Sequence, residues 1–137
     1  MAINNIFDVA SRSMSSQMTR LNTIATNLAN AKSVASTKEE AFRPIRPVFE
    51  VDYASDFRES GLSTTDVKDI VSLDREPERI FRPNHPMADE QGFVWESTVN
   101  VDEEMVEMME TNRQYQNTLE VVSTLRTLIS RTVSMGQ

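Results

Sequence analysis

The sequence contains no cysteine, which excludes disulfide bonds and thiolate metal sites within the chain. It has only three glycines, and all five of its prolines lie between residues 44 and 86. Helix-breaking residues are therefore concentrated in the middle of the chain, apart from Gly136 near its end. This distribution predicts helices at both ends and a middle segment rich in turns.

Long apolar runs are also missing. No stretch has the roughly 20 apolar residues that a membrane-spanning helix needs, and the N-terminus lacks the apolar run of a secretory signal peptide. We therefore expect no membrane span, and a protein that is cytoplasmic or leaves by a route that cleaves nothing. The net charge is −7 and no lysine- or arginine-rich patch stands out, so nucleic acid is not an expected partner.

Side chains suited to catalysis are scarce as well. His85 is the single histidine and lies between Asn84 and Pro86, where a turn or surface role is expected. No G-x-S-x-G motif, glycine-rich phosphate loop or EF-hand spacing occurs, and a zinc site would need more than one nitrogen or sulfur ligand in most cases. We expect no enzyme activity, no metal and no cofactor.

The N-terminal end has a heptad pattern. Apolar residues recur in alternating steps of four and three, the period of a helix that packs along another helix. The members of this seam are Ile3, Phe7, Ala10, Met14, Leu21, Ile24, Leu28 and Ala31.

The same helix is unusually polar. From Ser11 to Ser33, eleven of twenty-three residues are Ser, Thr or Asn, which are weak helix formers. Such a helix becomes stable only when its seam is buried, and small residues at Ala25 and Ala29 would let neighbouring backbones approach closely. The alternative is an ordinary amphipathic helix on a monomer's surface, with Ser and Thr serving solubility.

A second heptad pattern runs through the C-terminal end. Acidic residues crowd its first turns and arginines lie near its last, an order that suits a helix dipole from about residue 102 to 134. Asp102 is the expected N-cap. The seam residues are Val101, Met105, Met108, Asn112, Tyr115, Leu119, Val122, Leu125, Ile129 and Val133.

Two side-chain types on this seam have alternative roles. We expect the methionines Met105, Met108 and Met109 to fill core space rather than line a binding groove. Asn112 on a seam position either sets the helix register, as buried polar seam residues do, or is solvated.

The middle segment is expected to form short strands. Phe49, Val51 and Tyr53 alternate, while Pro44 and Pro47 oppose a central strand before them. Further strands are predicted within residues 64–73, within 78–82, and through Phe93 and Trp95. About sixty residues of short strands bury little apolar surface, so this module is expected to lean on the helices or on neighbours.

The predicted fold class is therefore α+β, with long terminal helices that pair as a coiled coil around a small β-rich middle module. The expected parts are an N-terminal helix in residues 1–35, the β-rich module in 36–100 and a C-terminal helix in 101–137.

Four motifs carry a family resemblance. The segments "SSQMTRLNTIATNLANAKS" and "VNVDEEMVEMMETNRQYQNTLE" resemble the first and last helices of bacterial flagellar rod and hook proteins. "FDVASRSMSSQ" and "RPNHPMADEQGFV" are similar to the short proximal-rod branch of that family. The resemblance covers nearly the whole chain and adds Asn27 and Asn30, which belong to the first motif, to the expected assembly residues.

The resemblance implies a structural subunit of the flagellar basal-body rod. Members of the family are exported unfolded by the flagellar type III apparatus without a cleaved signal, and their paired terminal helices line the axis of a hollow periplasmic shaft. The implied partners are other rod proteins, the adaptor at the base of the rod, the export apparatus and neighbouring copies of the chain. The alternative function is a soluble helical adaptor or export chaperone that stays in the cytoplasm.

Overall fold

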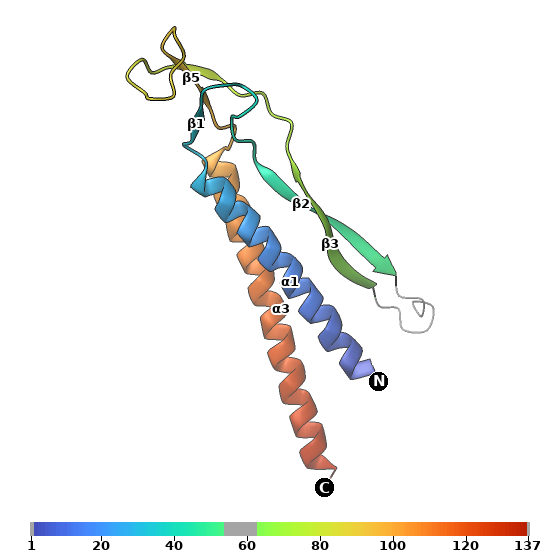
Figure 1. Ribbon diagram of the computed structural model, residues 1–137. Helices are drawn as coiled ribbons and strands as arrows, with labels where there is room; N and C mark the ends of the chain where they lie inside the picture. The colour runs from blue at the N-terminus through green and yellow to red at the C-terminus, as the bar shows by residue number, and fades with distance from the viewer. Residues whose placement is uncertain (1, 54–62, 137) are drawn as a thin grey trace.

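The computed structural model describes residues 2–53 and 63–136, and over these residues the chain has the expected α+β architecture. Two long helices, α1 (Ala2–Ala29) and α3 (Val101–Met135), lie side by side (Figure 1). A β hairpin runs along α1 (Figure 1). The chain termini lie at one end of the helix pair, and a small sheet lies past the opposite end (Figure 1). Coiled-coil packing of the helix pair stays a prediction. The side chain of Ile3 lies outside the described part of the chain.

Helix α1 is shorter than the predicted segment 1–35. At its end, the backbone N–H groups of Asn30 and Ala31 donate to the carbonyls of Asn27 and Leu28 at 3.1 and 3.2 Å, and so use carbonyls that a helix end leaves free. The chain then turns, and Val34–Ala35 form strand β1. The boundary therefore falls several residues earlier than expected, because the last turn tightens into hydrogen bonds that span three residues where heptad spacing still permits a helix.

Helix α3 begins at Val101, and its N-cap is Asn100 rather than the predicted Asp102. The Asn100 side-chain oxygen accepts hydrogen bonds from the backbone N–H groups of Asp102 and Glu103 at 3.0 and 3.2 Å. These are two of the N–H groups that a helix start leaves without partners. Asp102 instead belongs to the acidic first turn, where its charge favours the positive end of the helix dipole.

Strands β2 (Ile45–Tyr53) and β3 (Ser63–Ser72) form the antiparallel hairpin, with a register shift between Val48 and Phe49. The strand begins earlier than Pro47 led us to expect. A two-stranded ribbon has only edge strands, and a proline is tolerated there because it interrupts no central ladder.

The small sheet has the order β1–β5–β4, with β4 at Arg79–Phe81 and β5 at Phe93–Glu96. Val94 on the central strand is fully buried. The rings of Phe81 and Phe93 meet edge to face at 5.1 Å, and the guanidinium of Arg79 lies 4.3 Å above the centre of the Phe93 ring. These contacts join β4 to β5.

Gly92, in the turn before β5, has a φ of 81°, a backbone conformation that residues with a Cβ rarely adopt. A Cβ there would come within 3.0 Å of the Phe81 ring and of the Pro83 Cβ. We expect Gly92→Ala to lower the free energy of unfolding by about 1–3 kcal/mol, measured by thermal unfolding. An unchanged midpoint would contradict the constraint, and Gly136→Ala, at a negative φ with ordinary contacts, is the control.

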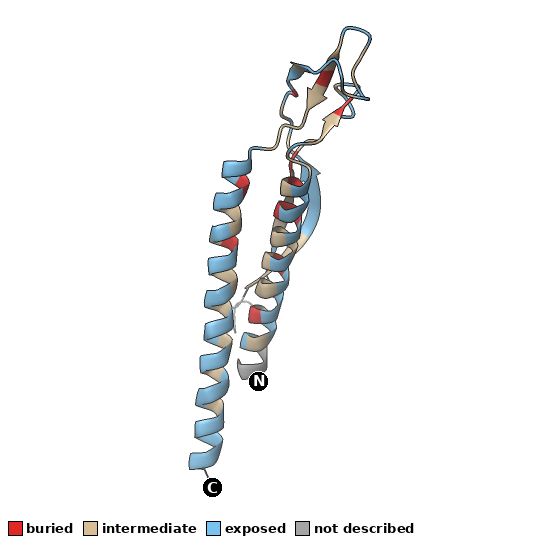
Figure 2. Ribbon diagram, turned by 90° about the vertical axis from the view of Figure 1, so that its left-hand side faces the viewer, coloured by how far each residue is buried: buried red, intermediate tan, exposed pale blue. Residues whose placement is uncertain are grey.

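Burial is uneven along the helices. Buried residues lie along α1, at the start of α3 and in the small sheet, while the rest of α3 is exposed or partly exposed (Figure 2). Among the described residues, only two in α3 are buried, and both are polar: Glu104 and Thr111. The single chain therefore has a thin apolar core, composed of Ala10, Ile24, Ala35, Ala41 and Val94.

Candidate assembly surface

The polar face of α1 packs on the hairpin. The hydroxyl of Ser16 donates to the backbone carbonyl of Thr65 at 2.9 Å, and Arg12 forms an ion pair with Asp66 at 3.0 Å. Ser16 and Thr23 are buried although both are polar. The high Ser, Thr and Asn content of this helix therefore has a structural role, because the face of α1 that packs on the hairpin meets strand backbone as well as side chains.

Asn27, near the end of α1, is the most specific of these contacts. Its side-chain oxygen accepts the backbone N–H of Ile45 at 2.8 Å, and its amide nitrogen donates to the carbonyl of the same residue at 2.9 Å. The amide thus pairs with Ile45 as a neighbouring strand would. A second hydrogen on the nitrogen is donated to Glu104 of α3 at 3.1 Å. Asn27 is 0 % exposed and makes these contacts within the single chain, while its expected contact with a neighbouring copy stays a prediction.

Glu104 and Arg46 complete this cluster, which we call the polar junction (Asn27, Arg46 and Glu104). The two guanidinium nitrogens of Arg46 lie 2.8 and 2.6 Å from the two carboxylate oxygens of Glu104, which is 0 % exposed. The hydrogen bond to Glu104 raises the pKa of Arg46 above its ordinary value. A buried carboxylate needs such a partner, because its desolvation is otherwise uncompensated.

A more exposed ion pair flanks the polar junction. Arg75, which follows β3, donates to Glu103 at 2.8 Å, and this hydrogen bond lowers the pKa of the Glu103 carboxyl below its ordinary value. The pair therefore favours the folded state above the ordinary carboxyl pKa, and this contribution is lost as the pH falls through the lowered pKa. Both side chains are more than a third exposed or close to it, so solvent screens the pair.

The buried stripe of α3 agrees with the predicted seam at some positions and lies one residue earlier at others. Met108, Tyr115, Val122 and Ile129 are half-buried, as their place on the predicted seam requires. Between them the chain buries Glu104, Thr111 and Thr118 more than it buries the predicted Met105, Asn112 and Leu119, which are exposed.

The shift corrects the expectation for the methionines and favours one of the two alternatives for Asn112. Met105 and Met109 are 46 % and 70 % exposed, so they do not fill the core of the single chain, although Met108 is half-buried. Asn112 is exposed, so it corresponds to the solvated alternative. The buried polar residues on the observed stripe are Glu104 and Thr111, and Asn27 and Arg46 hold the carboxylate of Glu104 between the helices and the hairpin.

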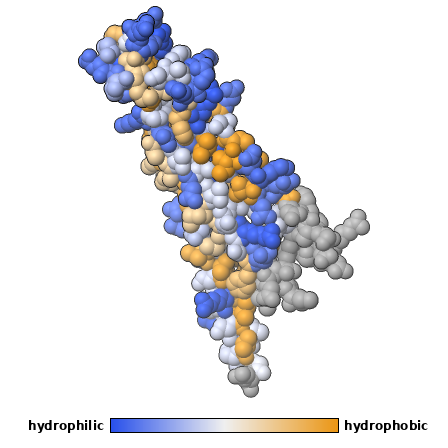
Figure 3. All heavy atoms as spheres, viewed as in Figure 1, coloured by the Kyte–Doolittle hydropathy of each residue, from blue (hydrophilic) through white to orange (hydrophobic). Residues whose placement is uncertain are grey.

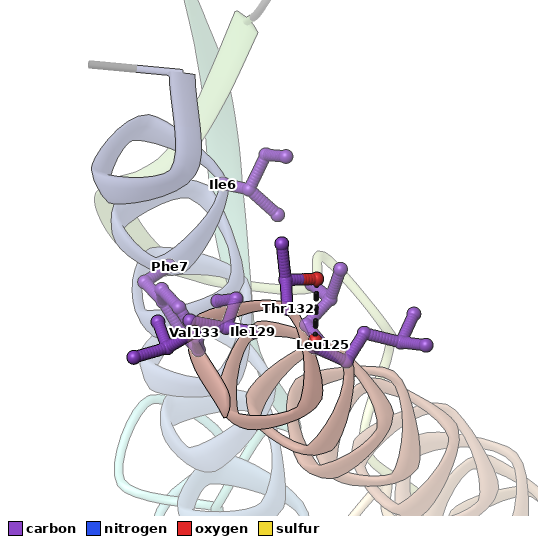
Figure 4. A pocket seen from close by; sticks show the side chains of 7 residues that line it. Ile6, Phe7, Leu125, Ile129, Thr132 and Val133 are labelled. Atoms are coloured by element: carbon purple, nitrogen blue, oxygen red, sulfur yellow. Dashed lines mark hydrogen bonds between the residues drawn. The ribbon is translucent and has the colours of Figure 1, made fainter. Parts of the chain in front are cut away.

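An apolar groove of about 220 Å³ lies between the far ends of the two helices. Phe7 of α1 lies beside Ile129 and Val133 of α3, and the side chains that line the groove are apolar except Thr132 (Figure 4). Thr132 donates its hydroxyl to the carbonyl of Leu128 within its own helix. Ile6, Leu128 and Val133 remain 37 %, 53 % and 63 % exposed.

The remaining predicted residues differ in their surroundings. Ala10 and Ile24 are buried within the chain, whereas Met14, Leu21, Leu28, Asn30 and Leu125 are half-buried. Ala25 and Ala29 are exposed, so no other part of the described chain closes on them. Hydrophobic side chains also gather over the middle of the face in Figure 3, and the hairpin exposes Val48, Val51, Ile70 and Val71.

Comparison with known proteins gives this surface its context. The family described as "Flagellar basal body rod FlgEFG protein C-terminal" matches residues 90–135, which contain β5, α3 and most of the groove. The chain is 36% identical to the flagellar basal-body rod proteins FlgC of Escherichia coli O6:H1 and Salmonella typhimurium, over the full length of each. It is 32% identical to FlgC of Aquifex aeolicus over 96% of both chains. The chain belongs to the FlgC family of flagellar basal-body rod proteins.

In this FlgC-family chain, sequence reasoning found Asn27 but missed Arg46, Glu104 and Ser16. Glu104 is one of three consecutive acids in the first turn of α3, and periodicity alone does not tell which of them is buried. The sequence gives no indication of a role for Arg46, because it lies between Pro44 and Pro47, where we expected no central strand.

The described residues can also be compared with the requirements of a membrane-spanning helix and of a metal site. Neither of its long helices, over the described ranges, has an apolar stretch sufficient to cross a bilayer. The histidine, aspartate and glutamate side chains of residues 2–53 and 63–136 form no group of three that could hold a metal ion.

Proposed function

We propose that the chain is a structural subunit of the proximal rod in the flagellar basal body. In this proposal, neighbouring rod subunits pack on the exposed apolar faces of α1 and α3, so that the rod transmits torque and its inner wall forms part of the export channel. The subunit reaches the periplasm through the flagellar export apparatus without a cleaved signal. Its partners are other rod proteins, the adaptor at the base of the rod and further copies of itself.

One observation carries the proposal: the long helix α3 leaves most of its large apolar side chains exposed. Val106, Met109 and Val133 are each more than 60 % exposed, and Met105, Leu119, Val121 and Leu128 are about half exposed. Helices in proteins owe most of their stability to packing, and extended apolar surfaces mark interaction sites. Neighbouring subunits would supply the packing that the single chain lacks.

The groove between the helix ends offers the second element of such an interface. Its lining comes from both chain termini, so a neighbour that fills it would fix α1 and α3 together. Contacts between unlike faces of successive subunits generate open helical assemblies when the rotation does not close. The small residues Ala25 and Ala29 on the exposed face of α1 would admit a further helix at close range.

The test is the location of the chain in its own bacterium. We expect deletion of the gene to abolish motility, the wild-type chain to restore it, and purified basal bodies to contain the chain when analysed by mass spectrometry. A chain that restores motility but remains in the cytoplasm and is absent from basal bodies would overturn the proposal. That result would favour the alternative, a helical adaptor or export chaperone.

A further inference from the structure

The polar junction joins three parts of the chain that are distant in sequence. Asn27 comes from α1, Arg46 from β2 and Glu104 from the first turn of α3. Both ends of the Asn27 amide are engaged with Ile45, and both oxygens of Glu104 face Arg46. The three side chains therefore fit only one relative placement of the two helices and the hairpin.

The rest of the helix interface is far less selective. A slide of α3 by one heptad would put Thr111 in the place of Glu104, and Tyr115 in the place of Met108. Apolar contacts are non-directional, so most of the seam would remain covered after such a slide. The ion pair of Arg20 with Glu107 also crosses the interface, but its side chains are 29 % and 34 % exposed, so water can replace a lost partner. The hydrogen bond of Gln17 with Gln114, at 3.0 Å, joins two uncharged groups. Beyond the helices, β1 pairs with β5 and the N–H of Ser97 donates to the carbonyl of Ser33 at 3.0 Å, so the connections 30–33 and 97–100 would have to take up the slide.

The same slide would be costly at the polar junction. Glu104 would leave Arg46 and move away from Asn27, while Arg46 would face a threonine. Losing the partner of a buried charge is strongly unfavourable. A buried polar residue that fixes register is the best-attested use of such groups in helix pairs.

We propose that the polar junction sets the axial register of α3 against α1 and the hairpin, and thereby presents the exposed apolar faces to neighbouring subunits at one height. Its members are positioning residues. The structural half of this inference is independent of the rod function, whereas the part about neighbouring subunits rests on it.

The test uses the double variant Arg46→Met/Glu104→Leu, which replaces the buried ion pair by apolar side chains of similar size. Such replacements of buried ion pairs are often neutral or stabilising, so this variant is expected to fold. A matched control, Arg20→Met/Glu107→Leu, makes the same changes at an ion pair whose side chains are 29 % and 34 % exposed. Asn27 keeps its two hydrogen bonds to Ile45 in both variants.

Register is read with a nitroxide label attached through Asn22→Cys, an exposed position on α1 in a chain without other cysteines. In the labelled parent and the control variant, we expect one centre of paramagnetic broadening in the amide spectrum of α3, near Glu107. In the double variant, we expect a second centre about seven residues further along, near Gln114, from the population displaced by one heptad.

The outcomes are distinct. A single centre near Glu107 in the double variant would overturn the register role, and so would a loss of every centre, because the ion pair would then serve stability alone. Motility tests the second half: we expect the double variant to be non-motile and the control variant to be motile. Full motility of a double variant with mixed register would overturn the link to assembly. Failure of the parent to enter basal bodies would instead refute the rod function.

Discussion

Arg46→Met alone should lower the free energy of unfolding by about 3–5 kcal/mol, because it leaves the carboxylate of Glu104 buried without its cation. Glu104 is 0 % exposed, and Arg46 is the only cation among the described residues that forms a salt bridge with it, although Arg75 also interacts with it electrostatically. Small domains have only about 5–15 kcal/mol of stability, so the loss is a large share of the total. Urea unfolding followed by the fluorescence of the single tryptophan, Trp95, measures it.

The control for this prediction is Arg20→Met, which removes a cation from the partly exposed pair with Glu107. Its expected effect is at most about 1 kcal/mol, since exposed ion pairs contribute little. Adding Glu104→Leu to Arg46→Met should recover most of the lost stability, because no unpaired charge then remains. A single variant as stable as the parent would show that the carboxylate reaches solvent in the folded chain and would contradict its assigned burial.

The helices and strands of the chain were predictable because they depend on local patterns. Proline and glycine are concentrated in the middle, and both ends carry heptads, so α1 and α3 were found close to their observed bounds. The strands through Phe49, Val67 and Trp95 followed from alternation and from turn residues around them. Each of these signals lies within a window of ten residues or so, and tertiary contacts did not reverse any of them.

The side chains of the helix interface were only partly predictable. Heptad spacing identifies two or three candidate stripes on a helix but does not say which one faces the partner. The observed choice depends on Asn27, Arg46 and Glu104, which meet from positions that are 19 to 77 residues apart. A contact that forms only between distant segments leaves no periodic trace in the sequence. For this reason Met105 and Leu119 were predicted on the buried stripe, whereas the structure buries Glu104 and Thr118 more.

The exposure of Leu119 makes it the most informative single position for assembly. It is 50 % exposed on the middle of α3, so Leu119→Asp should change the stability of the free chain by no more than about 0.5 kcal/mol. If neighbouring rod subunits cover this face, the same carboxylate would be buried there without a partner, at a cost of several kcal/mol in each contact. We therefore expect normal expression, no incorporation into basal bodies and no motility on soft agar.

Two control variants distinguish the effect of a charge on this face of α3 from the effect of an added charge elsewhere on the helix. Asn117→Asp places a carboxylate on the same turn but on another exposed side of α3, and should leave motility intact. Leu119→Met keeps an apolar side chain and should also remain motile. Leu28→Asp, which we expect to block assembly as well, is less decisive because Leu28 is half-buried within the chain and its substitution also disturbs folding. Motile Leu119→Asp cells would mean that this face of α3 stays in solvent in the rod, and the neighbour would then have to pack on α1 and the groove instead.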